Sequence, residues 1–410
     1  NNSLNSAIKK IKPNYVVKGK EYEEIFNPEE KIIKKNGGKL IFSSGQNVFT
    51  SKNIINQELK NNYSYLNFPK KFLIRHEIDN HQIIKYVNKI KKLNVLIIGD
   101  TILDDYIFCQ AEGMSREDPA LVVNPFKKKR FIGGAAIVAR HAKNLGANVE
   151  FVSILGNDEL GKFVKNSLKK TGIKCSFFYE ELKKTSVKIR YKHENKTLLR
   201  VNNIDKNSIS IKTQNLIFNY IKKQKKKIHL VVFSDFNYGF LTQNLINKLN
   251  KFFLRKNISQ VADCQSSSQL GNISKFKKMM LITPTEQEAR ISCSNYEDVL
   301  IVLSKKLKKN CGAKNIILTL DKEGILIHPD QVQRKKYLND KIEALNNNPI
   351  DVIGAGDSLF ISSSLLLKCG ANIWEASYFG SLCAAIQVSK IGNQSLELAE
   401  IIGSLSQNKY

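Results

Sequence analysis

Residues 351–358 read Asp-Val-Ile-Gly-Ala-Gly-Asp-Ser and stand directly before a long apolar run at 359–369. The run predicts a buried helix, and the Gly-Ala-Gly turn at its start points several backbone N–H groups into one concavity. Such a concavity binds anions, and the helix dipole reinforces it. Asp357 would repel a phosphate bound there, so it makes sense as a base beside a site of phosphoryl transfer. The alternative is an ordinary capped helix with Asp357 in its first turn.

Upstream of this stretch, apolar runs alternate with helical patterns such as 135–145 and 161–171. The run at 95–98 ends at Gly99-Asp100, and similar runs occupy 149–155, 229–233, 260–262, 279–282 and 315–320. This alternation predicts an α/β fold with a doubly wound, mostly parallel sheet. Two stretches with polar alternation, 121–131 and 185–202, predict a small antiparallel side sheet or lid.

The composition of the chain is that of a globular protein, with 410 residues, 42% of them hydrophobic and 25% charged, which excludes disorder throughout. The formal net charge is +28, but the chain has only nine Arg and its Lys residues are scattered. A solvated lysine-rich surface therefore explains the charge better than nucleic-acid binding, which stays a third hypothesis. Seven Cys without a CxxC pair and six dispersed His predict a reduced, cytoplasmic protein without a structural metal centre. No signal peptide or membrane-spanning apolar run is visible, so we expect no membrane partner.

Residues 1–65 differ from the rest of the chain in their pattern of predicted elements. They alternate short helical and strand patterns but are too few to close a nucleotide-binding sheet, so we interpret them as the C-terminal part of a domain. Residues 66–92 look like a linker with one amphipathic helix, and residues 93–410 form the main α/β domain. The chain starts at Asn1 without Met, and we expect that its native N-terminus lies further upstream.

The segment 351–358 resembles the C-terminal signature of the ribokinase-like (phosphofructokinase B type) sugar kinases. Gly133-Gly134-Ala135-Ala136 resembles the N-terminal Gly-Gly motif of that family. Within the family, the chain is most similar to the kinase half of bifunctional heptose-phosphate kinases and adenylyltransferases. This similarity covers roughly residues 94–400 and rests on segments at 99–106, 115–119, 234–235, 283–284, 319–324 and 390–392.

The N-terminal piece resembles the nucleotidyltransferase domain that partners such kinases. Residues 12–22 look like its Lys-Pro-Asp…Val-Lys-Gly-x-Asp-Tyr segment, and residues 49–55 look like the start of its closing helix. The resemblance implies that Lys18, Thr50 and Ser51 bind nucleotide phosphates. The HxGH motif of those enzymes is absent, and we expect it upstream of Asn1, in a fusion order inverted relative to the common bifunctional enzyme.

The resemblance also implies roles for the residues of the kinase part. Asp357 would be the general base, while the backbone N–H groups of Gly354, Ala355 and Gly356 would hold the charge of the transferred phosphoryl group. Substrate binding is implied for four residues, namely Asp104 at the carboxyl end of the first strand, Gly133, Gly134 and Arg116. Cofactor binding is implied for Glu288, which would organise Mg²⁺ through water, and for Asp235.

Five positions depart from the family pattern. The family pattern has Asn where this chain has Ile137 and Thr285, Lys where it has Tyr238 and Gln265, and Thr where it has Ile353. The leading hypothesis is an ATP- and Mg²⁺-dependent kinase for a sugar or sugar phosphate, joined to a nucleotidyltransferase that makes a nucleotide-activated sugar for surface glycans. The alternative is a degenerate, non-catalytic kinase fold that acts as a dimerisation scaffold. In either case the resemblance implies a homodimer, because lid strands of this family pair between subunits.

Overall fold

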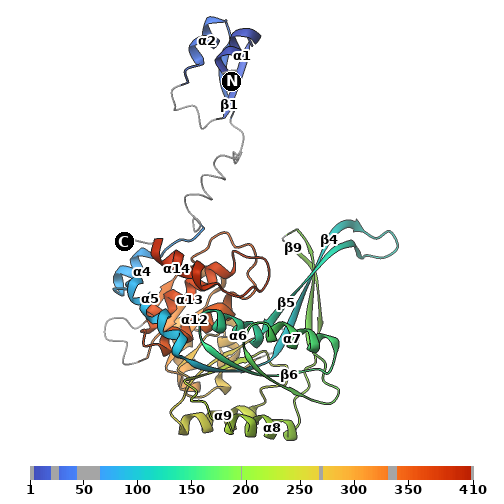
Figure 1. Cartoon of the computed structure of the whole chain (residues 1–410), viewed down its shortest axis with the longest axis vertical. Coiled ribbons are helices and arrows are strands. Elements are labelled where there is room, and N and C mark those ends of the chain that lie inside the picture. Colours follow the sequence, from blue (N-terminus) through green and yellow to red (C-terminus); the bar gives the residue numbers. More distant parts are fainter. Residues whose placement is uncertain are drawn as a thin grey trace. The chain divides into compact units, whose positions relative to one another are not determined.

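A computed structural model of the protein describes residues 4–19, 27–43, 65–194, 196–266, 271–330 and 339–407. The chain divides into two compact units, Asn1–Ser64 and Tyr65–Tyr410 (Figure 1). The described part of the first unit contains α1 (Leu4–Ile11), β1 (Tyr15–Gly19), α2 (Glu30–Lys35) and β2 (Lys39–Ser43). β1 and β2 pair in parallel, and Ile33 of α2 is buried.

The second unit is built around a nine-stranded sheet with the strand order β15-β14-β13-β12-β11-β10-β3-β6-β7. Pairing is parallel from β13 through β7, and β14 and β15 add two antiparallel strands at one edge. In chain order the strands are β3 (Asn94–Gly99), β6 (Asn148–Leu155), β7 (Lys174–Tyr179), β10 (Leu230–Asp235), β11 (Ser259–Cys264), β12 (Leu281–Ile282), β13 (Asn315–Thr319), β14 (Ile325–His328) and β15 (Asp340–Ile342). The predicted doubly wound, mostly parallel sheet is therefore confirmed.

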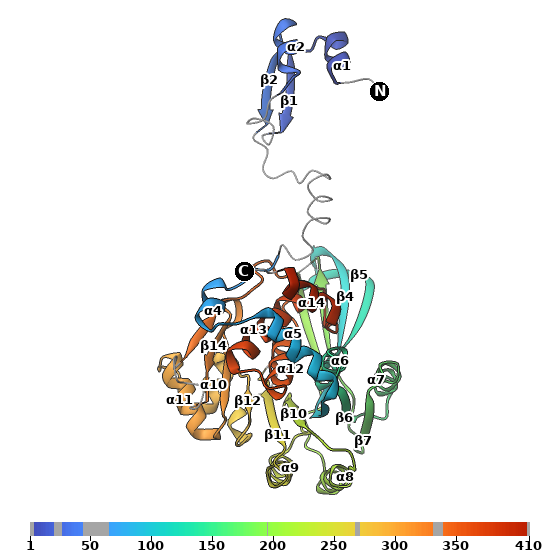
Figure 2. The same ribbon diagram turned by 60° about the vertical axis from the view of Figure 1, so that its left-hand side comes forward.

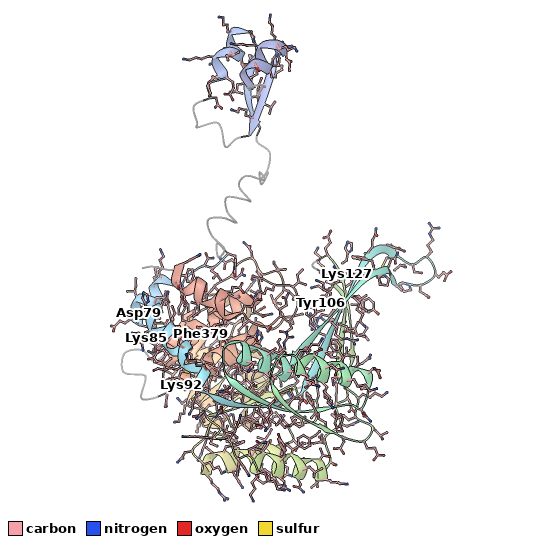
Figure 3. All side chains as sticks on the ribbon, viewed as in Figure 1. Asp79, Lys85, Lys92, Tyr106, Lys127 and Phe379 are labelled. Atoms are coloured by element: carbon pink, nitrogen blue, oxygen red, sulfur yellow. The ribbon has the colours of Figure 1, made fainter. Side chains whose placement is uncertain are left out.

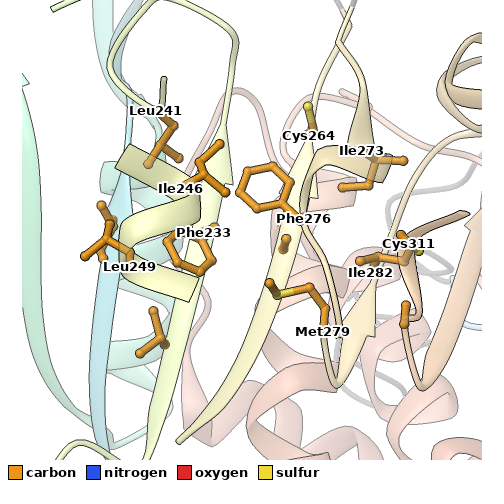
Figure 4. Packing of buried hydrophobic residues seen from close by; sticks show 14 of the residues in the cluster. Phe233, Leu241, Ile246, Leu249, Cys264, Ile273, Phe276, Met279, Ile282 and Cys311 are labelled. Atoms are coloured by element: carbon orange, nitrogen blue, oxygen red, sulfur yellow. The ribbon is translucent and has the colours of Figure 1, made fainter. Parts of the chain in front are cut away.

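Helices cover both faces of this sheet (Figure 2), which is why its central strands are continuous apolar runs. One face packs on α8 (Ile211–Lys222), α9 (Gln243–Arg255), α10 (Glu286–Cys293) and α11 (Leu300–Cys311). Phe233 and Phe276 lie at the centre of that layer (Figure 4). The other face carries α6 (Ala135–Asn144), α12 (Ala355–Lys368) and α13 (Ile373–Gln387), with α12 packed against both α6 and α13. α7 (Glu159–Lys169) packs on β7, and α14 (Leu398–Gln407) on α5 and α13.

A separate four-stranded sheet forms the predicted lid, in the order β5-β4-β8-β9 (Figures 1 and 3). The sequence predicted an antiparallel sheet, but β4 and β8 pair in parallel and only the outer pairs β5–β4 and β8–β9 are antiparallel, so the lid is a mixed sheet. Its strands are β4 (Thr101–Met114), β5 (Leu121–Gly134), β8 (Ser186–His193) and β9 (Lys196–Asn203). The sequence did not predict β4. That strand follows β3 with only Asp100 between them, so one polypeptide run passes from the central sheet into the lid.

The segment expected to be a linker belongs to the second unit. It folds into α4 (Lys70–Arg75), α5 (Asn80–Lys89) and a 3₁₀ turn, Ile90–Lys92. Six apolar side chains of this segment are buried, namely Leu66, Phe72, Leu73, Ile83, Val87 and Ile90. The His76 ring stacks on Trp374 of α13, and His76 Nε2 lies 2.6 Å from Asp340 Oδ2. The apolar stripe that predicted an amphipathic helix therefore adds to the core.

Among the described residues, no helix is long and apolar enough to cross a membrane.

Candidate active site

The start of α12 is the centre of the candidate site. α12 is buried along most of its length because its sequence is apolar on nearly all sides. Its N-cap, Gly354, has a φ of +84°, in the left-handed region that favours glycine. The first-turn N–H groups of an α-helix lack intrahelical partners, so this turn presents donors to whatever lies in front of it.

The two glycines of the turn have different surroundings. A Cβ on Gly354 would lie 2.3 Å from Asn393 Oδ1, so this position is closely packed. A Cβ on Gly356 would meet nothing within 4 Å, so open space lies directly beside the first turn of α12. Helix N–H groups beside open space are the arrangement that the predicted anion site requires.

Asp357 lies in the same first turn and is only 5% exposed. Burial, together with the nearby charge of Asp104, raises its pKa to about 7, and the charge of Lys188 opposes this shift. Gln265 Nε2 donates a hydrogen bond of 3.3 Å to Asp357 Oδ1. A carboxyl group that exchanges its proton near neutral pH is suited to act as a general base.

Asp104 lies on the lid strand β4, not at the carboxyl end of the first strand as the sequence indicated. The apolar run 95–98 ends the central strand earlier, and a new strand starts at Thr101. Asp104 is buried at the base of the lid, where its carboxylate forms an ion pair with Arg190 of β8. A Cβ on Gly133 would lie 2.6 Å from Asp104 Oδ2, so the Gly-Gly motif leaves room for this carboxylate.

The lid also brings three cations to the site that sequence reasoning missed. Lys188, Arg190 and Lys192 alternate along β8, so they share one face of that strand. β8 pairs with β4 in the register Asp104↔Lys188 and Tyr106↔Arg190. In the sequence, these three cations belong to the polar alternation of residues 185–202. That alternation predicted a strand but not the direction of its charged face.

This cationic face meets the residues before α12. Lys192 Nζ lies 3.5 Å from Asp351 Oδ2, and the Tyr106 hydroxyl donates to the same oxygen at 2.8 Å. Gly392 N also donates to Asp351 Oδ2, at 3.1 Å. Asp351 therefore ties the lid, the turn before α12 and the loop around Gly392 together.

Glu288 lies in the first turn of α10, where both of its oxygens accept backbone hydrogen bonds. Its Oε1 accepts from Ser266 N and its Oε2 from Thr285 N, each at 2.8 Å, and Thr285 Oγ1 completes a capping box. Burial raises the pKa of Glu288. Burial and the charges of Glu288 and Asp357 raise the pKa of the neighbouring Asp263 well above its usual value.

No group of three or more His, Cys, Asp or Glu in the described residues is arranged to hold a metal ion by itself. The buried carboxyl groups of Asp263 and Glu288 repel one another, and a nearby cation would relieve that repulsion. Mg²⁺ commonly keeps several waters and binds through one or two carboxylates and substrate phosphates. These residues therefore fit a Mg²⁺ ion that enters with a nucleotide, but not a cage made by protein alone.

Asp235 belongs to a second buried acidic pair. Its Oδ2 forms an ion pair with Lys275, and its Oδ1 accepts from Asn237 N at 2.9 Å. Asp100 lies close by, and burial and the charge of Asp235 raise its pKa to about 7. These contacts show Asp235 as part of the structure at the carboxyl ends of β3 and β10, the edge where open α/β sheets bind ligands.

Of the remaining predicted site residues, Arg116 belongs to the lid, Lys18 to the first unit, and Thr50 and Ser51 to neither described part. Arg116 is exposed in the loop between β4 and β5, ten or more strand positions beyond Asp104 and so roughly 30 Å away along the hairpin. Lys18 lies in the first unit, where it pairs with Glu29 and donates to Asn27 Oδ1 at 2.6 Å. Thr50 and Ser51 lie outside the described residues.

The five departures from the family pattern have definite places. Ile137 is fully buried in α6, and Tyr238 packs in a small apolar cluster with Ile102 and Phe236. Thr285 caps α10, and Ile353 N donates to Asp351 Oδ1 at 3.3 Å. Within the described part of the chain, Gln265 is the one departure whose side chain hydrogen-bonds a predicted catalytic residue, Asp357.

Comparison with known proteins agrees with this geometry. Residues 92–399 match the model of the pfkB family carbohydrate kinases. The protein named bifunctional protein HldE of Aliarcobacter butzleri is 29% identical over 76% of this chain, and its namesake from Campylobacter jejuni subsp. doylei is 31% identical over 76%. In both cases the match spans 64% of the relative's own length.

Solved structures show the same fold. Phosphofructokinase-2 from Escherichia coli superposes with a TM-score of 0.61 at 14% identity, covering 77% of this chain and 99% of that one. A ribokinase from Thermotoga maritima gives a TM-score of 0.57 at 18% identity, covering 77% and 100%. Arabidopsis thaliana ribokinase, solved with ribose and ATP, gives 0.59 at 14% identity, covering 77% and 99%. At these identities the likeness concerns the ribokinase-like fold alone.

Proposed function

The chain belongs to the pfkB family of carbohydrate kinases, and from this premise we propose that it transfers the γ-phosphoryl group of ATP to a hydroxyl of a sugar or sugar phosphate, heptose phosphate being the nearest model. Asp357 takes the proton of the attacking hydroxyl as its oxygen bonds to the γ-phosphorus, and ADP departs with the electrons of the broken bond. N–H groups at Gly354, Ala355 and Gly356 stabilise the charge on the transferred group.

One observation carries this proposal more than the others. Asp357, with a pKa of about 7, stands beside the open space at Gly356, at a helix N-terminus. A base and a set of anion donors thus share one helix turn, and phosphoryl transfer to a hydroxyl requires both close together. Asp104 and Gly133 border the site from the lid and supply a place for sugar hydroxyls.

The cationic face of β8 supports a substrate that carries a phosphate. Arg190 Nε is buried and has no hydrogen-bond partner among the described residues, although Arg190 Nη1 bonds Asp104. A buried donor without a partner is costly, and a phosphate or hydroxyl oxygen of the substrate would satisfy it. ATP is the phosphoryl donor in this proposal, and Mg²⁺ that enters with it would contact Asp263 and Glu288 through water. Mg²⁺ supplies charge neutralisation between the phosphates when bound.

We also propose that the first unit is part of a nucleotidyltransferase, so that the whole protein makes a nucleotide-activated sugar for surface glycans. The parallel pair β1–β2 and the motif around Lys18 support this, as does the word bifunctional in the names of the relatives. Its site in this unit would include Lys18, Thr50 and Ser51. The proposed cellular location is the cytoplasm, and the proposed assembly is a homodimer formed through the lid.

The deciding experiment measures ADP release from ATP and Mg²⁺ with a panel of hexoses, heptoses and their phosphates. We expect sugar-dependent turnover with at least one phosphorylated sugar, and a loss of at least a hundredfold in Asp357→Asn because the base is removed. If no sugar supports turnover and ATP does not bind, the kinase proposal is wrong and the non-catalytic scaffold takes its place.

A further inference from the structure

The loop after α13 places one amide side chain between the two glycine motifs of the site. Asn393 is 3% exposed. Its Oδ1 lies 2.3 Å from the position that a Cβ on Gly354 would take, and its Nδ2 lies 3.6 Å from the corresponding position at Gly133. A single side chain therefore borders both the turn that starts α12 and the Gly-Gly motif that ends β5.

The loop holds this side chain in place. Gln387 Nε2 donates to Gly392 O at 3.2 Å, and Gly392 N donates to Asp351 Oδ2 at 3.1 Å. Gln394 N closes a turn on Gly392 O at 3.0 Å. The residues on both sides of Asn393 are thus anchored, so its amide is pre-organised and loses little freedom when it binds a ligand.

The amide itself is not fully satisfied. Asn393 Oδ1 is buried and has no hydrogen-bond partner among the described residues. Buried polar atoms are nearly always paired, so an unpaired one at a site needs a ligand group or water to complete it. Its other end faces the carboxylate at the base of the lid. Because Asp104 Oδ2 is 2.6 Å and Asn393 Nδ2 is 3.6 Å from the same point at Gly133, these two atoms are no more than about 6 Å apart.

We propose that Asn393 is a sugar-binding residue of this enzyme, which shares a substrate hydroxyl with Asp104. The hydroxyl donates a hydrogen bond to Asp104 Oδ2 and accepts one from Asn393 Nδ2. Asn393 Oδ1 accepts a hydrogen bond from a second hydroxyl. A separation below about 6 Å lets one oxygen lie at hydrogen-bond distance from both groups. Ile137, which follows the Gly-Gly motif, is a fully buried apolar side chain in α6 and offers no hydrogen bond to a sugar.

Since this role rests on the proposed kinase function, the test uses both turnover and direct sugar binding. The variant Asn393→Leu keeps the branched shape of the side chain but removes both polar atoms. We expect its KM and Kd for the sugar substrate to rise about tenfold, with the KM for ATP unchanged. Deoxy analogues that lack the shared hydroxyl should bind wild type more weakly than the parent sugar, while Asn393→Leu should no longer distinguish the two.

Asn250→Leu is the matched control. Asn250 is also a buried asparagine, but it lies on α9 and donates to Lys277 O at 2.8 Å. We expect this control to lose thermal stability and keep the sugar KM, and Asn393→Leu to keep its thermal stability. An unchanged sugar KM and Kd in Asn393→Leu, or an equal loss of affinity for parent and deoxy sugars, would overturn the role of Asn393. If wild type neither turns over nor binds any sugar of the panel, the proposed function fails and this role falls with it.

Discussion

At the scale of single residues, the protonation of Asp357 sets the expected pH dependence. Its pKa of about 7 lies far above that of a free aspartate, and a base works only when ionised. We therefore expect kcat/KM to fall tenfold per unit as pH drops below 7 and to level off above it. Lys188 lowers the pKa of Asp357, so Lys188→Met should move the acidic limb of the pH–rate profile to higher pH. Initial rates of ADP release between pH 5.5 and 8.5 give the pH profiles of wild type and Lys188→Met. Identical profiles would contradict the assignment of Asp357 as the base.

The same residue also affects stability. A carboxyl whose pKa is raised in the folded state destabilises the fold once it ionises, so this cost is absent below pH 4 and complete above pH 7. Asp357→Asn should therefore be more stable than wild type at pH 8, by about 1 to 4 kcal/mol, and similar to it near pH 4. Urea unfolding at the two pH values gives the comparison. An equal difference in stability between wild type and Asp357→Asn at both pH values would show that ionisation of Asp357 is not its cause.

Gln265 provides a second test of the base. Its amide contacts Asp357 where the family pattern expects a lysine. A positive charge at this distance favours the carboxylate, so Gln265→Lys should shift the acidic limb of the rate profile to lower pH by about one unit. Gln265→Met removes the hydrogen bond without adding charge, and it should shift the limb in the opposite direction.

At the scale of elements, the start of α12 allows two glycine substitutions to be compared. Gly354→Ala puts a methyl group against Asn393 Oδ1 at a φ of +84°, so we expect it to destabilise the fold by about 1 to 3 kcal/mol. Gly356→Ala meets open space, so its stability should stay within about 0.5 kcal/mol while kcat falls, because the methyl group enters the phosphoryl site. Thermal unfolding and turnover, measured on both variants, separate the two effects. Equal losses of stability would contradict the geometry of the turn.

The elements also show what the sequence could predict. Continuous apolar runs identified the buried strands, because strands covered on both faces need no polar alternation. The strand β4 was missed because its polar residues, Asp104 and Asp105, interrupt the apolar pattern, and their partners Arg190 and Arg130 are distant in sequence. The glycine turn before α12 was predictable because its motif is contiguous. The site role of Asn393 was not, since only the folded chain brings it between Gly133 and Gly354.

At the scale of the whole molecule, the lid sheet exposes apolar side chains that a dimer would cover. Phe126 is 72% exposed, Met114 63% and Leu199 55%, all on lid strands. If the proposed homodimer forms through this sheet, Phe126→Glu places a charge in the interface and should yield monomers in sedimentation velocity runs. Ile74→Glu, on α4 with Ile74 73% exposed, is the matched control and should leave the assembly unchanged. A monomeric wild type would rule out the dimer.

The passage from β3 into β4 has a consequence for how ATP is protected from water. Asp104 lies on the lid strand β4, whereas Asp357 lies in the core helix α12, and only Asp100 separates the two sheets along the chain. Displacing the lid would therefore take the sugar-holding carboxylate away from the base and leave the reactive centre incomplete. A water molecule is too small to contact both the lid and the core as the proposed sugar would. It would therefore not be held in position to attack the γ-phosphate. Under the proposed function we therefore expect slow ATP hydrolysis when no sugar acceptor is present.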